Sequence, residues 1–188
     1  MEFVLEIQNN LSKDFCKRII DIFESHPEKF PGRTLSGVNL NTKRSTDCFI
    51  DDDLIWGDVD NILCDKLRLG FMSYLGYLRT ITDGKFHNTE VPVSDLGYTV
   101  QRTGKGGFYK WHSDESGPRL YAFIWYLNTL KPEDGGCTEF YTGRKIRPEE
   151  GKLLFFPASW TYIHRGATVL TDTYKYIVTG FIQDMRDD

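Results

Sequence analysis

The stretch RLYAFIWYL, residues 119–127, is the most informative part of the chain about its fold. From Leu120 onward its side chains are apolar at odd and even positions alike. Because successive side chains of a strand point to opposite faces, both faces of this strand must be covered by other parts of the protein. We therefore expect a strand buried between two sheets.

Three further segments have the composition of β-strands, and Gly, Pro, Asp and Asn residues separate them. They span residues 97–101, 151–156 and 174–183. Asp134-Gly135-Gly136 is a tight-turn signal between strands. Many short strands without a βαβ alternation are typical of a sandwich or jelly roll. The predicted fold class is mainly β with flanking helices (α+β).

The flanking helices are expected in the first half of the chain. Ser12 is a candidate N-cap, and apolar residues then recur at helical spacing until His26-Pro27. A second apolar stripe at helical spacing runs from about residue 58 to residue 78. We expect both helices to cover one face of a sheet. The polar stretch 31–53 between them is either a loop or a short edge strand.

Length and composition limit the remaining possibilities. The 188 residues suit one domain, 1–188, with helical support over about 1–85 and a jelly-roll core over about 90–185. A net charge of −4 argues against nucleic-acid or membrane-surface partners. No apolar run approaches the ~20 residues of a membrane span, and the N-terminus lacks signal-peptide features. We expect a cytoplasmic protein with four reduced cysteines, and the oligomeric state stays open.

Two histidines and one aspartate form a candidate metal site. His112 and Asp114 lie two apart on an extended segment, so their side chains point to the same side, and His164 follows on a distant strand. Two imidazoles and a carboxylate on one face of an ion are the ligands of non-haem Fe(II) oxygenases. Zinc is disfavoured because no cysteine lies at ligand spacing and no third histidine is available. The alternative is that both histidines are merely structural. His26 is expected at a helix end, and His87 on the surface or in a loop.

Lys175 is a candidate anion anchor. It falls on the predicted strand 174–183, where Ile177 and Thr179 point to the same side. If that side faces inward, the buried ammonium needs an anion, which a dicarboxylate cosubstrate would provide. The alternative is a surface lysine on an edge strand.

The segment Gln101–Gln183 resembles the catalytic core of the 2-oxoglutarate- and Fe(II)-dependent dioxygenases, in particular their prolyl 4-hydroxylase-like branch. The likeness rests on five motifs in order, which are His112-x-Asp114, the Gly-Gly-x-Thr-x-Phe turn at 135–140, Phe156-Pro157, His164-Arg165-Gly166 and Lys175. The resemblance implies a double-stranded β-helix (a cupin-like jelly roll) in which His112, Asp114 and His164 hold Fe(II). It also places the distal carboxylate of 2-oxoglutarate on Lys175, with Tyr126 assisting there.

Three more positions take a role only from the resemblance. Arg119 matches an arginine that faces the peptide substrate, and Phe181 stands where relatives often have a tryptophan that lines the active site. Tyr109 matches a pocket tyrosine, which we group with the cosubstrate-binding residues. Without the resemblance they would be a solvated arginine, a core phenylalanine and a packed tyrosine. One departure is Thr103, at a position where relatives commonly have a tyrosine that touches 2-oxoglutarate.

The activity that the resemblance implies is hydroxylation of an unactivated C–H bond. O2 and 2-oxoglutarate are consumed, succinate and CO2 are released, and ascorbate is a candidate reductant. The substrate we favour is a prolyl residue in a protein or peptide. Two alternatives remain: hydroxylation of a free amino acid or other small metabolite, and a turnover-deficient metal-binding jelly-roll module, for which Thr103 is the only support.

Overall fold

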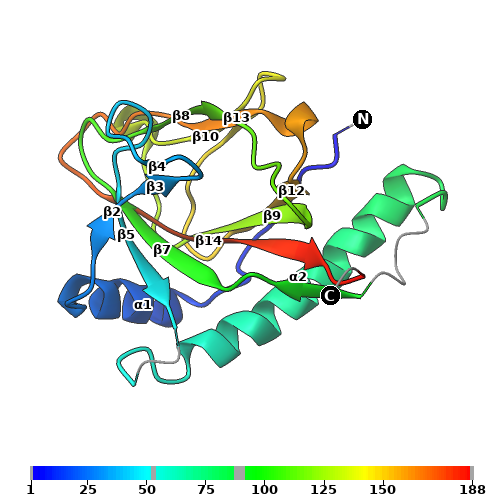
Figure 1. Ribbon diagram of the computed structural model, residues 1–188, viewed down its shortest axis with the longest axis horizontal. Helices are drawn as coiled ribbons and strands as arrows, with labels where there is room; N and C mark the ends of the chain where they lie inside the picture. Colours follow the sequence, from blue (N-terminus) through cyan, green and yellow to red (C-terminus); the bar gives the residue numbers. More distant parts are fainter. Residues whose placement is uncertain (1, 52–53, 87–91, 187–188) are drawn as a thin grey trace.

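Two sheets and two long helices make up the fold (Figure 1). The computed structural model describes residues 2–51, 54–86 and 92–186. In these ranges the larger sheet has eight strands and the smaller sheet has four, while β3 (Arg33–Thr34) and β4 (Gly37–Val38) form a separate hairpin. The double-layered, mostly β architecture confirms the predicted jelly-roll class with supporting helices.

The larger sheet runs through the middle of the molecule. Its strands follow the order β1 (Leu5–Ile7), β12 (Leu153–Pro157), β9 (Arg119–Tyr126), β14 (Lys175–Asp184), β7 (Tyr98–Thr103), β5 (Thr46–Ile50) and β2 (Phe30–Pro31), and β6 (Val93–Asp95) pairs with β14. The smaller sheet has the order β11 (Lys145–Ile146), β10 (Thr138–Phe140), β13 (His164–Gly166) and β8 (Tyr109–His112). Short 3₁₀ turns span Pro132–Asp134 and Trp160–Tyr162.

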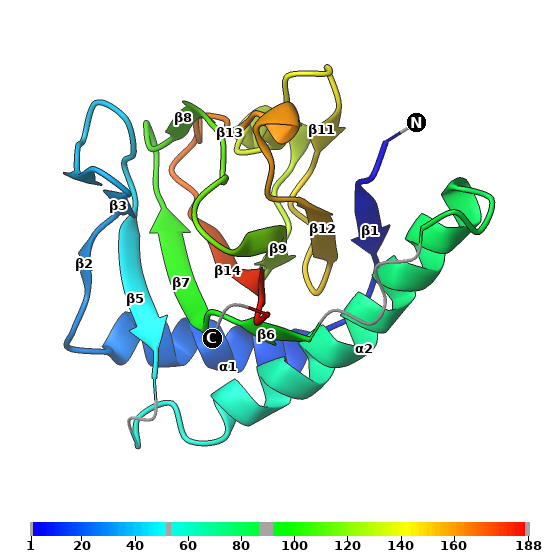
Figure 2. The ribbon, with the colours of Figure 1, turned by 45° about the vertical axis from the view of Figure 1, so that its right-hand side comes forward.

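Both helices lie along one face of the larger sheet, as the views in Figures 1 and 2 show, and the smaller sheet lies on the other side. Helix α1 (Lys13–Ser25) begins after Ser12, whose hydroxyl accepts a hydrogen bond from the Phe15 amide, and ends at His26. Helix α2 (Val59–Ile81) continues one turn beyond the predicted end. The amphipathic stripes therefore identified both helices and the face that they bury.

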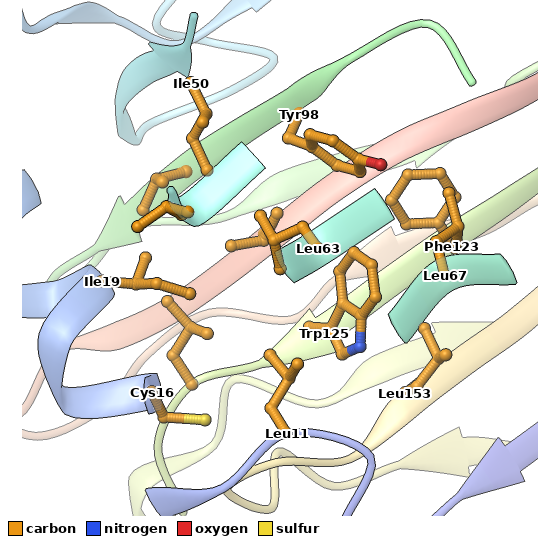
Figure 3. Close-up of a cluster of buried hydrophobic side chains, with 14 of the residues drawn as sticks. Leu11, Cys16, Ile19, Ile50, Leu63, Leu67, Tyr98, Phe123, Trp125 and Leu153 are labelled. Atoms are coloured by element: carbon orange, nitrogen blue, oxygen red, sulfur yellow. The ribbon is translucent and has the colours of Figure 1, made fainter. Parts of the chain in front are cut away.

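Strand β9 joins the two halves of the core. Tyr121, Phe123 and Trp125 face the helices, and Figure 3 shows the last two packed among residues that include Ile19 and Leu63. The intervening residues, such as Ile124, belong to a second apolar cluster on the other face. The prediction that both faces are buried is confirmed. The prediction of a sheet on both sides is wrong for one side, where the helices cover the strand.

The polar stretch 31–53 contains both a strand and a connecting segment. Residues 46–50 form β5, which lies between β7 and β2 in the sheet, so the strand at the edge is β2 (Phe30–Pro31) and only its Pro31 falls in this stretch. The connecting segment, residues 39–45, runs beside β8. The Lys110 amide donates to the Thr42 carbonyl at 2.9 Å, and the Arg44 amide donates to the Phe108 carbonyl at 2.8 Å. This segment therefore ties the smaller sheet to the larger one.

Other expectations from the sequence have clear outcomes. All four cysteines are free thiols, as predicted. His26 is the C-cap of α1 and stacks on Trp56, which confirms a structural role. The expectation for His87 lies outside the described residues. Among the helices that the structure describes, none has the length and apolar character needed to cross a membrane.

Candidate metal centre and adjoining cavity

The two histidines and the aspartate that the sequence singles out converge in space. Strand β8 ends at His112, Asp114 follows two residues later, and β13 pairs with β8 so that His164 lies opposite His112. Their ligand atoms all lie within 4.8 Å of one another. Each histidine Nε2 is 3.5 Å from an Asp114 carboxylate oxygen. No second cluster of this kind occurs among the described residues.

Backbone carbonyls fix the orientation of both imidazoles. The Nδ1 of His112 is 2.7 Å from the Lys110 carbonyl oxygen, and the Nδ1 of His164 is 3.0 Å from the Tyr162 carbonyl oxygen. A carbonyl only accepts, so both Nδ1 atoms carry the proton and both Nε2 lone pairs are left for a metal. The Tyr109 ring also stacks on His112, with 3.6 Å between ring centroids.

The protonation states also suit metal binding. Burial raises the pKa of Asp114, but the neighbouring imidazoles of His112 and His164 and the Arg119 guanidinium outweigh it, so the net shift is downward. Burial lowers the pKa of His164. Asp114 is therefore ionised and His164 neutral near neutral pH, as metal ligands must be. Two imidazole nitrogens and one carboxylate are a set of ligands that would hold Fe(II).

A cavity of about 620 Å³ adjoins the three ligands, and Lys175 lines it. The lysine is 5% exposed and lies opposite Thr103 in the pairing of β14 with β7. Within the described ranges its ammonium makes no hydrogen bond or ion pair, and its Nζ lies 5.6 Å from the centre of the Tyr126 ring. Burial lowers its pKa to about 8. Lys175 is therefore a buried cation that faces a cavity and lacks an anion, which is the environment that a dicarboxylate would complete.

The two aromatic residues grouped with Lys175 occupy different places. Tyr109 lines the cavity, and burial raises its pKa to about 12, so its hydroxyl stays neutral. Tyr126 is fully buried outside the cavity wall, and its hydroxyl donates to Thr138 Oγ1 at 2.7 Å. Thr138 does line the cavity. Tyr126 thus lies behind the wall and packs against Lys175, while direct contact with a cosubstrate stays a prediction.

Arg119 and Phe181 form one unit of the cavity wall. The guanidinium carbon of Arg119 lies 3.7 Å from the centre of the Phe181 ring, as in a cation–π contact. Its Nη1 donates to the Asp114 backbone carbonyl at 3.3 Å. Both side chains line the same cavity as the three ligands. A role of these two residues in substrate binding stays a prediction.

Sequence reasoning missed a buried ion pair in the same cavity. Lys43 Nζ lies 2.7 Å from Asp47 Oδ2, and the two residues are 4% and 3% exposed. Both line the cavity. The sequence offers only a polar run at this point, which is more typical of a solvated loop. No local signal distinguished these two residues from their polar neighbours.

Comparisons with known proteins agree with this geometry. Residues 98–183 match the family model of the 2OG-Fe(II) oxygenase superfamily. The match assigns residues 98–183 to this superfamily, and that assignment implies a dioxygenase that uses Fe(II), 2-oxoglutarate and O2. No curated protein matches the chain by sequence.

Solved structures of prolyl hydroxylases share the fold over nearly the whole chain. The viral collagen prolyl hydroxylase of Paramecium bursaria Chlorella virus-1, in its 2OG complex, is 19% identical with a TM-score of 0.71, covering 98% of this chain and 97% of that one. The Pseudomonas putida prolyl-4-hydroxylase is 18% identical with a TM-score of 0.72, covering 97% and 94%. A Trichoplax adhaerens prolyl hydroxylase, in complex with a peptide fragment of the hypoxia inducible factor oxygen degradation domain, is 18% identical with a TM-score of 0.73, covering 100% and 86%. At these identities the likeness shows a common fold.

Proposed function

We propose that residues 1–188 form a single dioxygenase domain that hydroxylates a prolyl residue in a protein or peptide. The observation that carries the proposal is the convergence of His112, Asp114 and His164 beside a cavity lined by Lys175, which has no ion-pair partner among the described residues. In this proposal the three clustered side chains hold Fe(II), and Lys175 binds the distal carboxylate of 2-oxoglutarate. When bound, iron and 2-oxoglutarate supply an oxidant able to hydroxylate an unactivated C–H bond, with release of succinate and CO2.

The side chains of the protein bind and orient the cosubstrate. The Lys175 ammonium donates to the carboxylate, and the apolar side chains of Ile124 and Ile177 in the cavity wall keep water from that contact. Thr103 lies across from Lys175 and lines the cavity, so we propose that its hydroxyl replaces the tyrosine that relatives commonly have there. Tyr126 supports this end of the cavity through Thr138.

Arg119 and Phe181 support a peptide as the substrate. A guanidinium stacked on an aromatic ring is held in place yet keeps donors free for a substrate carbonyl. Phe181 offers a flat apolar surface of the kind that packs on a prolyl ring. The Trichoplax prolyl hydroxylase has the same fold and was solved with a peptide fragment bound, which favours a peptide as the substrate of this chain. Ascorbate is proposed as the reductant that keeps the iron in the Fe(II) state.

The test is turnover of 2-oxoglutarate by the iron-loaded protein, with mass spectrometry of the added substrate. We expect proline-containing peptides to stimulate turnover and to gain one oxygen on a prolyl residue, whereas free proline does neither. Asp114→Ala should abolish coupled turnover while the fold is retained. Stimulation by free amino acids or metabolites instead of peptides would favour the small-molecule hydroxylase. Binding of iron without turnover under any of these conditions would favour the turnover-deficient module.

A further inference from the structure

The buried pair of Lys43 and Asp47 has no part in the chemistry proposed above. Each residue is at least nine-tenths buried, and the ion pair between them is 2.7 Å long. Ser45 Oγ donates to the other carboxylate oxygen of Asp47 at 2.6 Å. All three residues line the cavity that adjoins the metal ligands. The cavity wall therefore contains a fixed charge pair in addition to Lys175.

Stability alone is a weak reason for this pair. Removing two charges from water is costly, and their attraction in a buried site often does no more than offset that cost. An apolar pair of similar volume would hold the connecting segment 39–45 about as well. An ion pair with a third hydrogen bond does, however, define the position of each group more narrowly than apolar packing does.

Lys43 is connected to the metal centre by contacts with one aromatic ring, that of Tyr109. Its backbone bridges to Tyr109, and its Nζ lies 5.3 Å from the centre of the Tyr109 ring. That ring stacks on His112 with 3.6 Å between centroids and an angle of 18° between planes. The contacts thus run from Asp47 through Lys43 and Tyr109 to His112.

We propose that Lys43 and Asp47 are positioning residues for the iron. They fix the Tyr109 ring, which covers one face of the His112 imidazole, while the Lys110 carbonyl fixes its Nδ1 edge. Together these contacts aim the His112 Nε2 at the metal. This inference rests on the proposed iron site. Groups that orient a ligating histidine typically change metal affinity by about 10–100-fold when they are lost.

The test measures binding of Co(II) alone, by titration and by its visible d–d absorption, without 2-oxoglutarate or substrate. The double variant K43M/D47L removes both charges, so it leaves no buried charge unpaired. K43R keeps the cation and serves as the conservative variant. K152M is the matched control, because Lys152 is 1% exposed and pairs with Glu6 and Glu149 at 2.9 Å each, but does not line the cavity.

K43M/D47L is expected to melt near the wild-type temperature yet bind Co(II) about tenfold more weakly, with an altered d–d spectrum. K43R should restore both, and K152M should lose stability with wild-type Co(II) affinity. Wild-type affinity and spectrum in K43M/D47L would overturn the inference. If that variant does not fold, Lys43→Gln, which can still hydrogen-bond to Asp47 but removes the cation from the Tyr109 ring, must show the weaker affinity. An unchanged value overturns the inference. Failure of the wild-type protein to bind Co(II) would instead overturn the proposed iron site.

Discussion

Replacing Lys175 by methionine is expected to stabilise the ligand-free protein while weakening 2-oxoglutarate binding. Burial lowers the pKa of this lysine from 10.5 to about 8. At ~1.36 kcal/mol per pKa unit, holding the ammonium charged in the ligand-free protein costs roughly 3 kcal/mol. Methionine has a similar unbranched stem and no charge, so it removes this cost and keeps most of the packing.

The sign of the pH dependence follows from the same shift. Between pH 8 and about 10.5 the unfolded chain binds the lysine proton and the folded protein does not, so the ligand-free wild type gains stability as the pH rises. This gain should be absent in Lys175→Met. Binding of 2-oxoglutarate needs the charged form, so its affinity should fall above about pH 8.

Two assays measure the two effects. Thermal or denaturant unfolding of the ligand-free protein at pH 7 should give a higher free energy of unfolding for Lys175→Met, by up to roughly 3 kcal/mol. Calorimetric titration with 2-oxoglutarate should show about 10–100-fold weaker binding, since a charge-assisted hydrogen bond is worth ~1.5–3 kcal/mol. Lys152→Met is the control, because Lys152 is equally buried but paired. It should destabilise the protein and leave 2-oxoglutarate binding unchanged.

Two results would refute this reasoning. A Lys175→Met protein that is less stable than the wild type would mean that the ammonium has an anionic partner in the ligand-free protein. An unchanged affinity for 2-oxoglutarate would mean that another group binds the distal carboxylate. The Lys152→Met control separates both results from a general effect of losing a buried lysine.

The remaining predictions concern the helix packing and the substrate side of the cavity. Gly70→Ala in α2 should destabilise the protein by ~1–3 kcal/mol, because the added Cβ would lie 2.5 Å from Leu153 Cδ2. A Cβ added at Gly76 in the same helix would have no neighbour within 4 Å, so Gly76→Ala should stabilise the protein by ~0.5–1 kcal/mol. If denaturant melts gave the same change in the free energy of unfolding for both variants, the packing of α2 on β12 would be contradicted. Arg119→Leu should raise the KM for a peptide substrate and leave the affinity for 2-oxoglutarate unchanged. A reduced affinity for 2-oxoglutarate would mean that Arg119 binds the cosubstrate and not the peptide.

The sequence predicted the parts of the fold that depend on regular patterns. The stripes of α1 and α2 and the apolar run of β9 follow from periodicity, because burial of a whole face leaves a repeating signal. Three strands of the smaller sheet, β8, β10 and β13, are three or four residues long and carry polar residues of the site. Segments this short, with polar and apolar residues mixed, show no repeating pattern from which a strand could be predicted.

The candidate site was predictable where spacing or motif constrains it. His112 and Asp114 are two residues apart, and His164 and Lys175 stand in a recognisable order after them. The pair of Lys43 and Asp47 depends on the fold, which brings the connecting segment beside β8 and into the cavity. Tyr126 shows the converse, since its position in the sequence suggested the cavity and the fold places it behind Thr138.

The central claim is that His112, Asp114 and His164 bind one Fe(II) that also binds 2-oxoglutarate. The most direct measurement is anaerobic addition of Fe(II) and then 2-oxoglutarate to the wild type and to Asp114→Ala, followed by visible absorption. A weak charge-transfer band that needs both additions, and that Asp114→Ala lacks while still folded, is the predicted result. Absence of the band in the wild type, or an equal band in Asp114→Ala, would contradict the claim.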